Sequence, residues 1–76
     1  MLYEVGDYIK AEFKDKRTGE VEWMWVNVSS ANSDLRVVFG QLDSQPITNS
    51  DLRLGMELAV SYDNIREHMK PESLKQ

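Results

Sequence analysis

The segment Tyr8–Lys14 constrains the fold most strongly, because apolar and charged side chains alternate along it as YIKAEFK. A period of two is typical of a β-strand that buries one face. The loop 15–20 follows this segment, and its Gly19 can adopt the positive φ that a hairpin turn of this length usually needs. The sequence therefore predicts that the segment begins an antiparallel hairpin.

Three further segments have strand character. Residues 21–28 are rich in β-branched and aromatic side chains, which favour strands. Residues 35–42 predict a third strand that ends before Pro46, because proline cannot donate to a strand ladder. Residues 56–61 predict a fourth strand. The stretch 47–55 is rich in turn residues and favours no regular element.

The periodicity changes near the C-terminus. Asp63 can cap a short helix over 64–69, which would place Ile65 and Met69 on one face. Pro71 should end this helical turn, and residues 71–76 should be frayed. The whole pattern predicts one domain of residues 1–76 with an ordered core of about 3–70. We expect a mainly β fold: a small antiparallel sheet that curls into an SH3-like partial barrel, with a short C-terminal helical turn.

Pairing across the two loops predicts the buried face. Asp15 opposite Glu20 aligns Ile9 with Val26 and Ala11 with Met24, since paired side chains lie on one side of a sheet. Val28 opposite Leu35 then aligns Met24 with Phe39. The predicted core comprises Ile9, Ala11, Phe13, Met24, Val26, Val28, Leu35, Val37, Phe39 and Leu58. A slip of one residue would exchange the faces.

The opposite face is unusually apolar. This register places Lys10 beside Trp25 and Trp25 beside Val38, with Trp23 and Lys14 further along the same face. Either the chain covers the tryptophans with residues 47–54 or the C-terminal helix, or they form an exposed platform for a peptide, a base or a second copy. The candidate binding residues are Trp23, Trp25, Val38, Lys10 and Lys14.

Composition narrows the function classes. The chain has 76 residues, a formal net charge of −4 and no cysteine. The negative charge works against phosphate contacts, so nucleic acid is a disfavoured partner. The chain lacks the roughly 18 consecutive apolar residues of a membrane span, and residues 1–4 lack the pattern of a signal peptide. We expect no membrane association and a cytoplasmic location.

Catalytic and metal-binding patterns are missing from the sequence. His68 is the one histidine, and without cysteine it cannot complete a zinc set. The four glycines are dispersed, so no phosphate-binding loop is present, and no serine lies in a nucleophile elbow. The acidic residues have no diagnostic spacing for acid–base catalysis. We expect no enzyme activity, no cofactor, no metal and no small-molecule substrate.

Three parts of the chain resemble one bacterial family. They are 6–13 with its Gly-Asp-Tyr-Ile-Lys start, the centre 22–28 (EWMWVNV), and Leu52–Gly55 together with Asp63-Asn64-Ile65. The chain is similar over about residues 6–66 to the YegJ-like bacterial domain of unknown function, family 2314. This resemblance implies a small bacterial β-rich domain and transfers no catalytic or binding residue.

Three functions remain open. The first is a non-catalytic protein-interaction module whose aromatic sheet face or open strand edge binds a protein partner or a second copy as a homodimer. The second is a small-barrel contact domain for nucleic acid or the ribosome, in which Trp25 stacks on a base near Lys10 and Lys14. The third is a purely structural domain. The acidity of the chain favours the first over the second.

Overall fold

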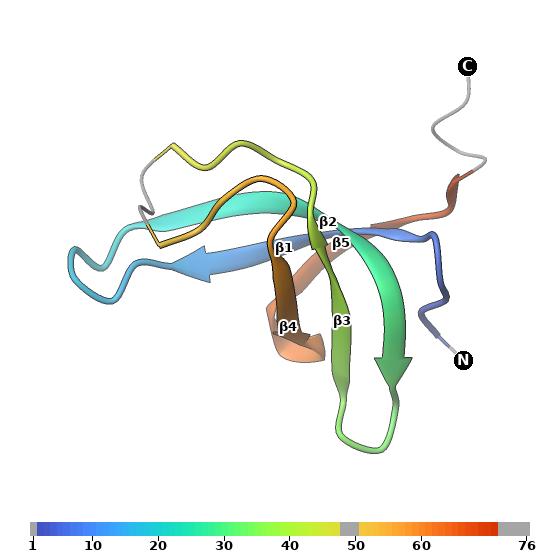
Figure 1. Ribbon diagram of the computed structural model, residues 1–76. Helices are drawn as coiled ribbons and strands as arrows, with labels where there is room; N and C mark the ends of the chain where they lie inside the picture. The colour runs from blue at the N-terminus through green and yellow to red at the C-terminus, as the bar shows by residue number, and fades with distance from the viewer. Residues whose placement is uncertain (1, 48–50, 72–76) are drawn as a thin grey trace.

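The computed structural model describes residues 2–47 and 51–71, which form one antiparallel sheet of five strands in the order β4-β3-β2-β1-β5 (Figure 1). The strands are β1 (Tyr8–Lys14), β2 (Val21–Asn32), β3 (Val37–Leu42), β4 (Glu57–Ser61) and β5 (Ile65–Met69), and the 3-10 turn η1 (Tyr62–Asn64) joins β4 to β5. The predicted mainly β fold is confirmed. The sheet curls without closing, because β4 and β5 occupy its two edges.

The first hairpin has the predicted register. Ile9 pairs with Val26 and Ala11 with Met24 across β1 and β2. The loop is closed by a 2.8 Å hydrogen bond from the Asp15 amide to the Glu20 carbonyl, and Gly19 has φ +77°. Alternation in β1 therefore fixes which side chains of β2 face the core.

The predicted register of the second hairpin is wrong. β2 continues to Asn32, which pairs with Val37, and Val26 faces Leu42 instead of Val37. The register shifts between Val28 and Ser30, where β2 contains a β-bulge. A bulge changes which side chains of its strand point inward. The turn that follows contains Arg36 at φ +54°.

This shift changes the membership of the core. The buried apolar residues are Tyr3, Ile9, Ala11, Met24, Val26, Val28, Val38, Leu42 and Val60. Two predicted core residues are exposed, Leu35 by 69% and Phe39 by 41%. Phe13, Val37 and Leu58 are half-buried. Val38 and Leu42 point inward because β3 is displaced by five residues from the predicted pairing, with Leu42 in place of Val37 opposite Val26, and an odd displacement exchanges the two faces of a strand.

Gly40 marks a close approach of β3 to β2. A Cβ atom at this position would lie 2.8 Å from Cγ1 of Val26 and would collide with the carbonyl oxygen of Asn27. Gly40 pairs with Val28 on one side and with Leu58 on the other. Only glycine lets the backbones come this close.

The predicted helix over 64–69 is wrong, because Ile65–Met69 form strand β5 and pair with β1. The connection between β4 and β5 is the 3-10 turn η1, whose start is capped by a 3.2 Å hydrogen bond from the Asp63 amide to Oγ of Ser61. Pairing with β1 satisfies backbone groups that an exposed single-turn helix would leave open. The predicted frayed tail lies, from residue 72 onward, outside the described residues.

Candidate functional site

Trp23 and Trp25 lie on the outer face of β2, on the side opposite the buried Met24. Trp23 is 51% exposed, whereas Trp25 is half-buried. The chain after β3 runs along the strand edge at Trp25, where the Asp43 amide donates to the Trp25 carbonyl and the Trp25 amide donates to Oγ of Ser44. We call Trp23 and Trp25 the tryptophan pair.

The ammonium of Lys10 lies near both rings of the tryptophan pair. Its Nζ is 5.9 Å from the ring centroid of Trp23 and 5.8 Å from that of Trp25. Lys10 pairs with Trp25 across the β1–β2 ladder, so the register of these two strands places the ammonium group near the rings. These distances are those of cation–π contacts. The tryptophan pair thus already accommodates a cation.

Carboxylates surround the tryptophan pair. Glu12 pairs with Trp23 across the ladder, and its Oε1 lies 3.2 Å from Nη2 of Arg66. Glu67 pairs with Lys10 from the other side, with 3.7 Å between Oε2 and Nζ. Both acids are partly solvated, so these ion pairs contribute little stability. Because each acid is paired with a cation, these four side chains together carry no net charge.

A shallow hollow adjoins the tryptophan pair on the same face. Tyr8, Asn27 and Gln41 lie on one cross-strand row, next to the row of Lys10 and Trp25. The hollow has a volume of about 270 Å³ and is lined by Tyr8, Asn27, Gln41, Leu42, Asp43, Leu54 and Gly55. Its lining combines hydrogen-bonding side chains with an apolar rim.

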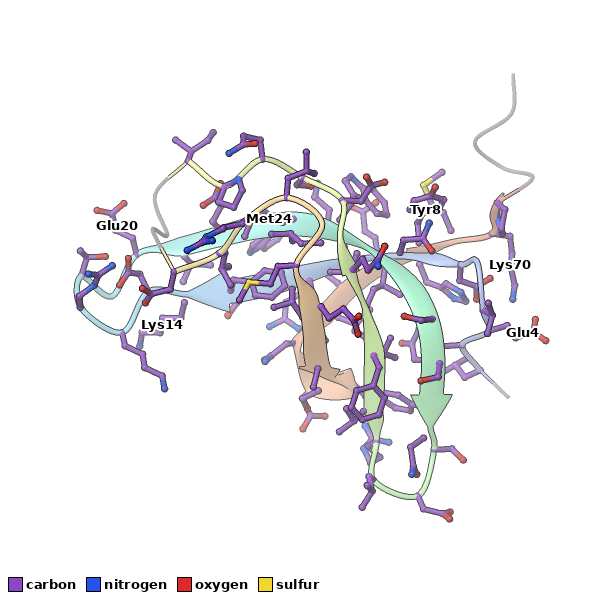
Figure 2. All side chains as sticks on the ribbon, viewed as in Figure 1. Glu4, Tyr8, Lys14, Glu20, Met24 and Lys70 are labelled. Carbon is purple, nitrogen blue, oxygen red and sulfur yellow. The ribbon has the colours of Figure 1, made fainter. Side chains whose placement is uncertain are left out.

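Two predicted site residues do not join the tryptophan pair. Val38 is 0% exposed and packs in the core, so its predicted place on the outer face is wrong. The cause is the changed pairing of β3 with β2 described above. Lys14 lies at the end of β1 opposite Val21 and lines another hollow with Phe13, Lys16 and other residues (Figure 2). The structure brings Trp23, Trp25 and Lys10 together.

Sequence reasoning missed a polar cluster around Asp7, which is 1% exposed. Its Oδ2 accepts hydrogen bonds from the Glu4 amide at 3.0 Å and from Nζ of Lys70 at 3.0 Å. Nε2 of His68 lies 2.7 Å from the same oxygen. Lys70 also contacts Glu4 at 2.7 Å, at the end of the sheet where both are labelled in Figure 2. This cluster fastens the N-terminal turn to β5.

The pKa values within the polar cluster follow its hydrogen bonds. Burial works to raise the pKa of Asp7, but hydrogen bonds from His68, the Glu4 amide and Lys70 outweigh it and lower the pKa. Hydrogen bonding to Lys70 lowers the pKa of Glu4, and hydrogen bonding to Glu4 and Asp7 raises the pKa of Lys70. Asp7, Glu4 and Lys70 are therefore held in their charged forms near neutral pH.

Aromatic rings pack beside the polar cluster. The ring of the buried Tyr3 meets those of Tyr62 and His68 edge-on, each at 4.9 Å between centroids. The guanidinium of Arg36 lies 5.2 Å from the centroid of Tyr62. Burial is the main cause that raises the pKa of Tyr3. The two ring contacts tie the N-terminal segment to η1 and β5, and the contact of Arg36 ties η1 to the turn between β2 and β3.

Within residues 2–47 and 51–71, no group of three or more His, Cys, Asp or Glu side chains is arranged to hold a metal ion. Over the same residues, no helix is long and apolar enough to span a membrane. Both findings apply to the described ranges alone.

Comparison with known proteins identifies the family. The model of a family described as an uncharacterised protein conserved in bacteria, domain of unknown function 2314, matches residues 4–75. The chain therefore belongs to this family, as its resemblance implied. No curated protein and no solved structure matches the chain significantly.

Proposed function

We propose that this bacterial domain is a non-catalytic protein-interaction module that binds an extended, basic segment of a partner protein on its outer sheet face. The observation that carries the proposal is the ammonium of Lys10 at 5.8–5.9 Å from both rings of the tryptophan pair. Lys10 acts as an internal copy of the group that an arginine or lysine of the partner would present.

The net charge of the chain supports a basic partner. Glu12 and Glu67 flank the tryptophan pair but are each paired with a cation, so the charge that favours a basic segment is the −4 of the chain as a whole. Opposite charges of this kind guide encounter and exclude acidic partners. The same net charge argues against the alternative of a nucleic-acid contact, because it works against the approach of phosphates.

The spacing of the face suits an extended chain. Trp23, Trp25 and Asn27 repeat every second residue on one side of β2, and alternate residues of an extended peptide repeat over the same distance of about 7 Å. A basic residue at the tryptophan pair would therefore place a neighbouring side chain near the hollow at Leu54. Asn27 and Gln41 can hydrogen-bond the backbone of such a peptide.

The strand order and the position of η1 between the two edge strands support the description of the sheet as an SH3-like partial barrel. The proposal retains the cytoplasmic location expected from the sequence. It assigns no catalytic role to the Asp7 cluster, since the hydrogen bonds of Asp7 join the N-terminal turn to β5 and the residue after it.

A random-peptide display selection on the immobilised domain tests this function. We expect enrichment of peptides that carry arginine or lysine, with binding lost in Trp23→Ala and Trp25→Ala. Phe39→Ala is the matched control, because Phe39 is an exposed aromatic residue on β3, away from the pair. Since the chain has two tryptophans, quenching of intrinsic fluorescence reports binding directly.

Lys10→Met sharpens the test, because it removes the competing internal ammonium while it keeps an apolar stem. Basic peptides should bind this variant about 2- to 5-fold more tightly, which corresponds to one exposed cation–π contact. Weaker binding by Lys10→Met, or enriched peptides that bind the Trp23→Ala variant unchanged, would overturn the proposal. Enrichment of acidic peptides would also contradict it.

A further inference from the structure

The two edges of the sheet are protected to different degrees. Edge strand β5 carries Arg66, Glu67 and His68, its ladder with β1 is interrupted by a register shift, and Pro71 follows it. Charges, bulges and proline are the usual devices that prevent an edge from pairing with another chain. Edge strand β4 has the sequence ELAVS and a continuous ladder with β3. It has one charged residue.

The backbone groups on the free side of β4 can be identified. Tyr62 donates to the carbonyl of Arg36, and Leu42 donates to the carbonyl of Met56. Hydrogen-bonded pairs alternate in an antiparallel ladder, so Leu58 and Val60 bond to β3 between these two positions. The N–H and C=O groups of Glu57 and Ala59 and the N–H group of Ser61 therefore point away from β3, and in the described part of the chain no other strand pairs with this side of β4.

The strand β4 is complementary to itself. When two copies align antiparallel about Ala59, Glu57 lies opposite Ser61, Leu58 opposite Val60, and Ala59 opposite its own copy. This register joins the outward-pointing backbone groups and brings no like charges face to face. It also pairs apolar side chains on the inner side, where Leu58 is only half-buried in the single copy.

Apolar surface next to β4 supports the same arrangement. Phe39 pairs with Ala59 across the β3–β4 ladder and is 41% exposed on the outer face. In the paired arrangement, two small Ala59 side chains lie between two Phe39 rings, so the two β4 strands can approach each other without a steric clash at the two-fold axis. We infer that the β4 edge binds a second copy of this chain, which forms a two-fold dimer with a continuous sheet through the two β4 strands.

Light scattering across a range of protein concentrations tests the dimer. The wild type should show twice the monomer mass at high concentration. Ala59→Lys and Ala59→Glu should each remain monomeric, because each places like charges together at the two-fold axis. An equimolar mixture of the two variants should recover the dimer mass, since opposite charges then meet. Leu35→Lys, at an exposed apolar residue in the β2–β3 turn, is the control and should dimerise like the wild type.

Amide hydrogen exchange supplies a second readout that does not depend on a variant folding. Exchange at Glu57, Ala59 and Ser61 should slow as the dimer forms, while exchange along the free edge of β5 stays constant. A wild type that stays monomeric at every concentration, or a dimer that survives Ala59→Lys, would overturn the inference. The dimer should persist in Trp23→Ala, so its failure and that of the peptide-binding proposal are distinguishable.

Discussion

Replacing Asp7 by asparagine isolates the contribution of the polar cluster to stability. The change keeps the shape of the side chain and removes its charge in a place that is 1% exposed. A hydrogen bond to a charged group contributes about 1.5–3 kcal/mol, whereas a neutral one contributes about 0.5–1.5 kcal/mol. The bond with His68 should therefore weaken by about 1 kcal/mol.

The introduced amide adds a second cost. Its NH2 group is a donor in a site where the Glu4 amide and Lys70 also donate to one carboxylate oxygen. One buried polar atom then lacks a partner, at a cost of about 1 kcal/mol. The total loss of about 2 kcal/mol compares with a whole-domain stability of about 4–11 kcal/mol, estimated from the chain length. The melting temperature should fall by about 10 °C.

The assay is thermal and urea denaturation beside a matched aspartate variant. Asp63 is 80% exposed on its side chain and pairs with Arg36 at 3.2 Å, so Asp63→Asn should change the melting temperature little. The two positions share residue type and an ion pair but differ in burial. Equal effects of Asp7→Asn and Asp63→Asn would refute the reasoning.

Acid provides an independent check on Asp7. Its pKa in the folded state is lowered, so its stabilising contribution is present above the ordinary aspartate pKa of about 4 and is lost as the pH falls through the folded-state pKa. The difference in unfolding free energy between wild type and Asp7→Asn should therefore shrink between about pH 5 and pH 2. A constant difference over this range would contradict the assignment.

Two further predictions concern packing. In urea denaturation, Gly40→Ala should destabilise the domain more than Gly19→Ala does. A Cβ at Gly40 would collide with β2, whereas a Cβ at Gly19 would meet nothing within 4 Å and would cost only the strain of φ +77°. Val26→Ala should lower the unfolding free energy by about 2 kcal/mol, since Val26 is 0% exposed, and Phe39→Ala should lower it by less than about 1 kcal/mol, since Phe39 is 41% exposed. Equal losses for the second pair would contradict the register of β3.

The first hairpin was predictable because its strand has one clear apolar face. The charged side chains of Lys10 and Glu12 are more stable in water, so Ile9 and Ala11 face inward. Because Met24 and Val26 pair with these two residues, they face inward as well. Lys10 and Trp25 were placed side by side by the same reasoning. These placements needed only alternation and one turn glycine.

The second hairpin was not predictable in the same way. Strand β2 is apolar on both sides, so a bulge between Val28 and Ser30 leaves no mark in the pattern. The turn that follows uses Arg36 in the left-handed region instead of a glycine, which removes the usual signal for its position. The misplacement of Val38 and Phe39 follows from the later turn and the bulge together, which place Leu42 instead of Val37 opposite Val26.

Strand β5 could not be predicted from the sequence because its charged residues mask the strand pattern. Ile65 and Met69 lie four residues apart, a spacing that favours a helix, and the charged residues between them give no strand alternation. The Asp7 cluster was hidden for a related reason. Asp7 and His68 are 61 residues apart in the chain, and only the pairing of β1 with β5 brings them together.

This long-range pairing has a consequence for the order of folding. Strands β1 to β4 pair with their neighbours in the chain, so each of these ladders closes across a single connection, whereas β1 with β5 must close almost the whole domain. Closing a longer loop costs more entropy, and non-local pairing slows folding. During synthesis β5 also leaves the ribosome last of the five strands. Whenever η1 and β5 are not yet in place, one edge of β1, with Ile9 and Ala11, is therefore open.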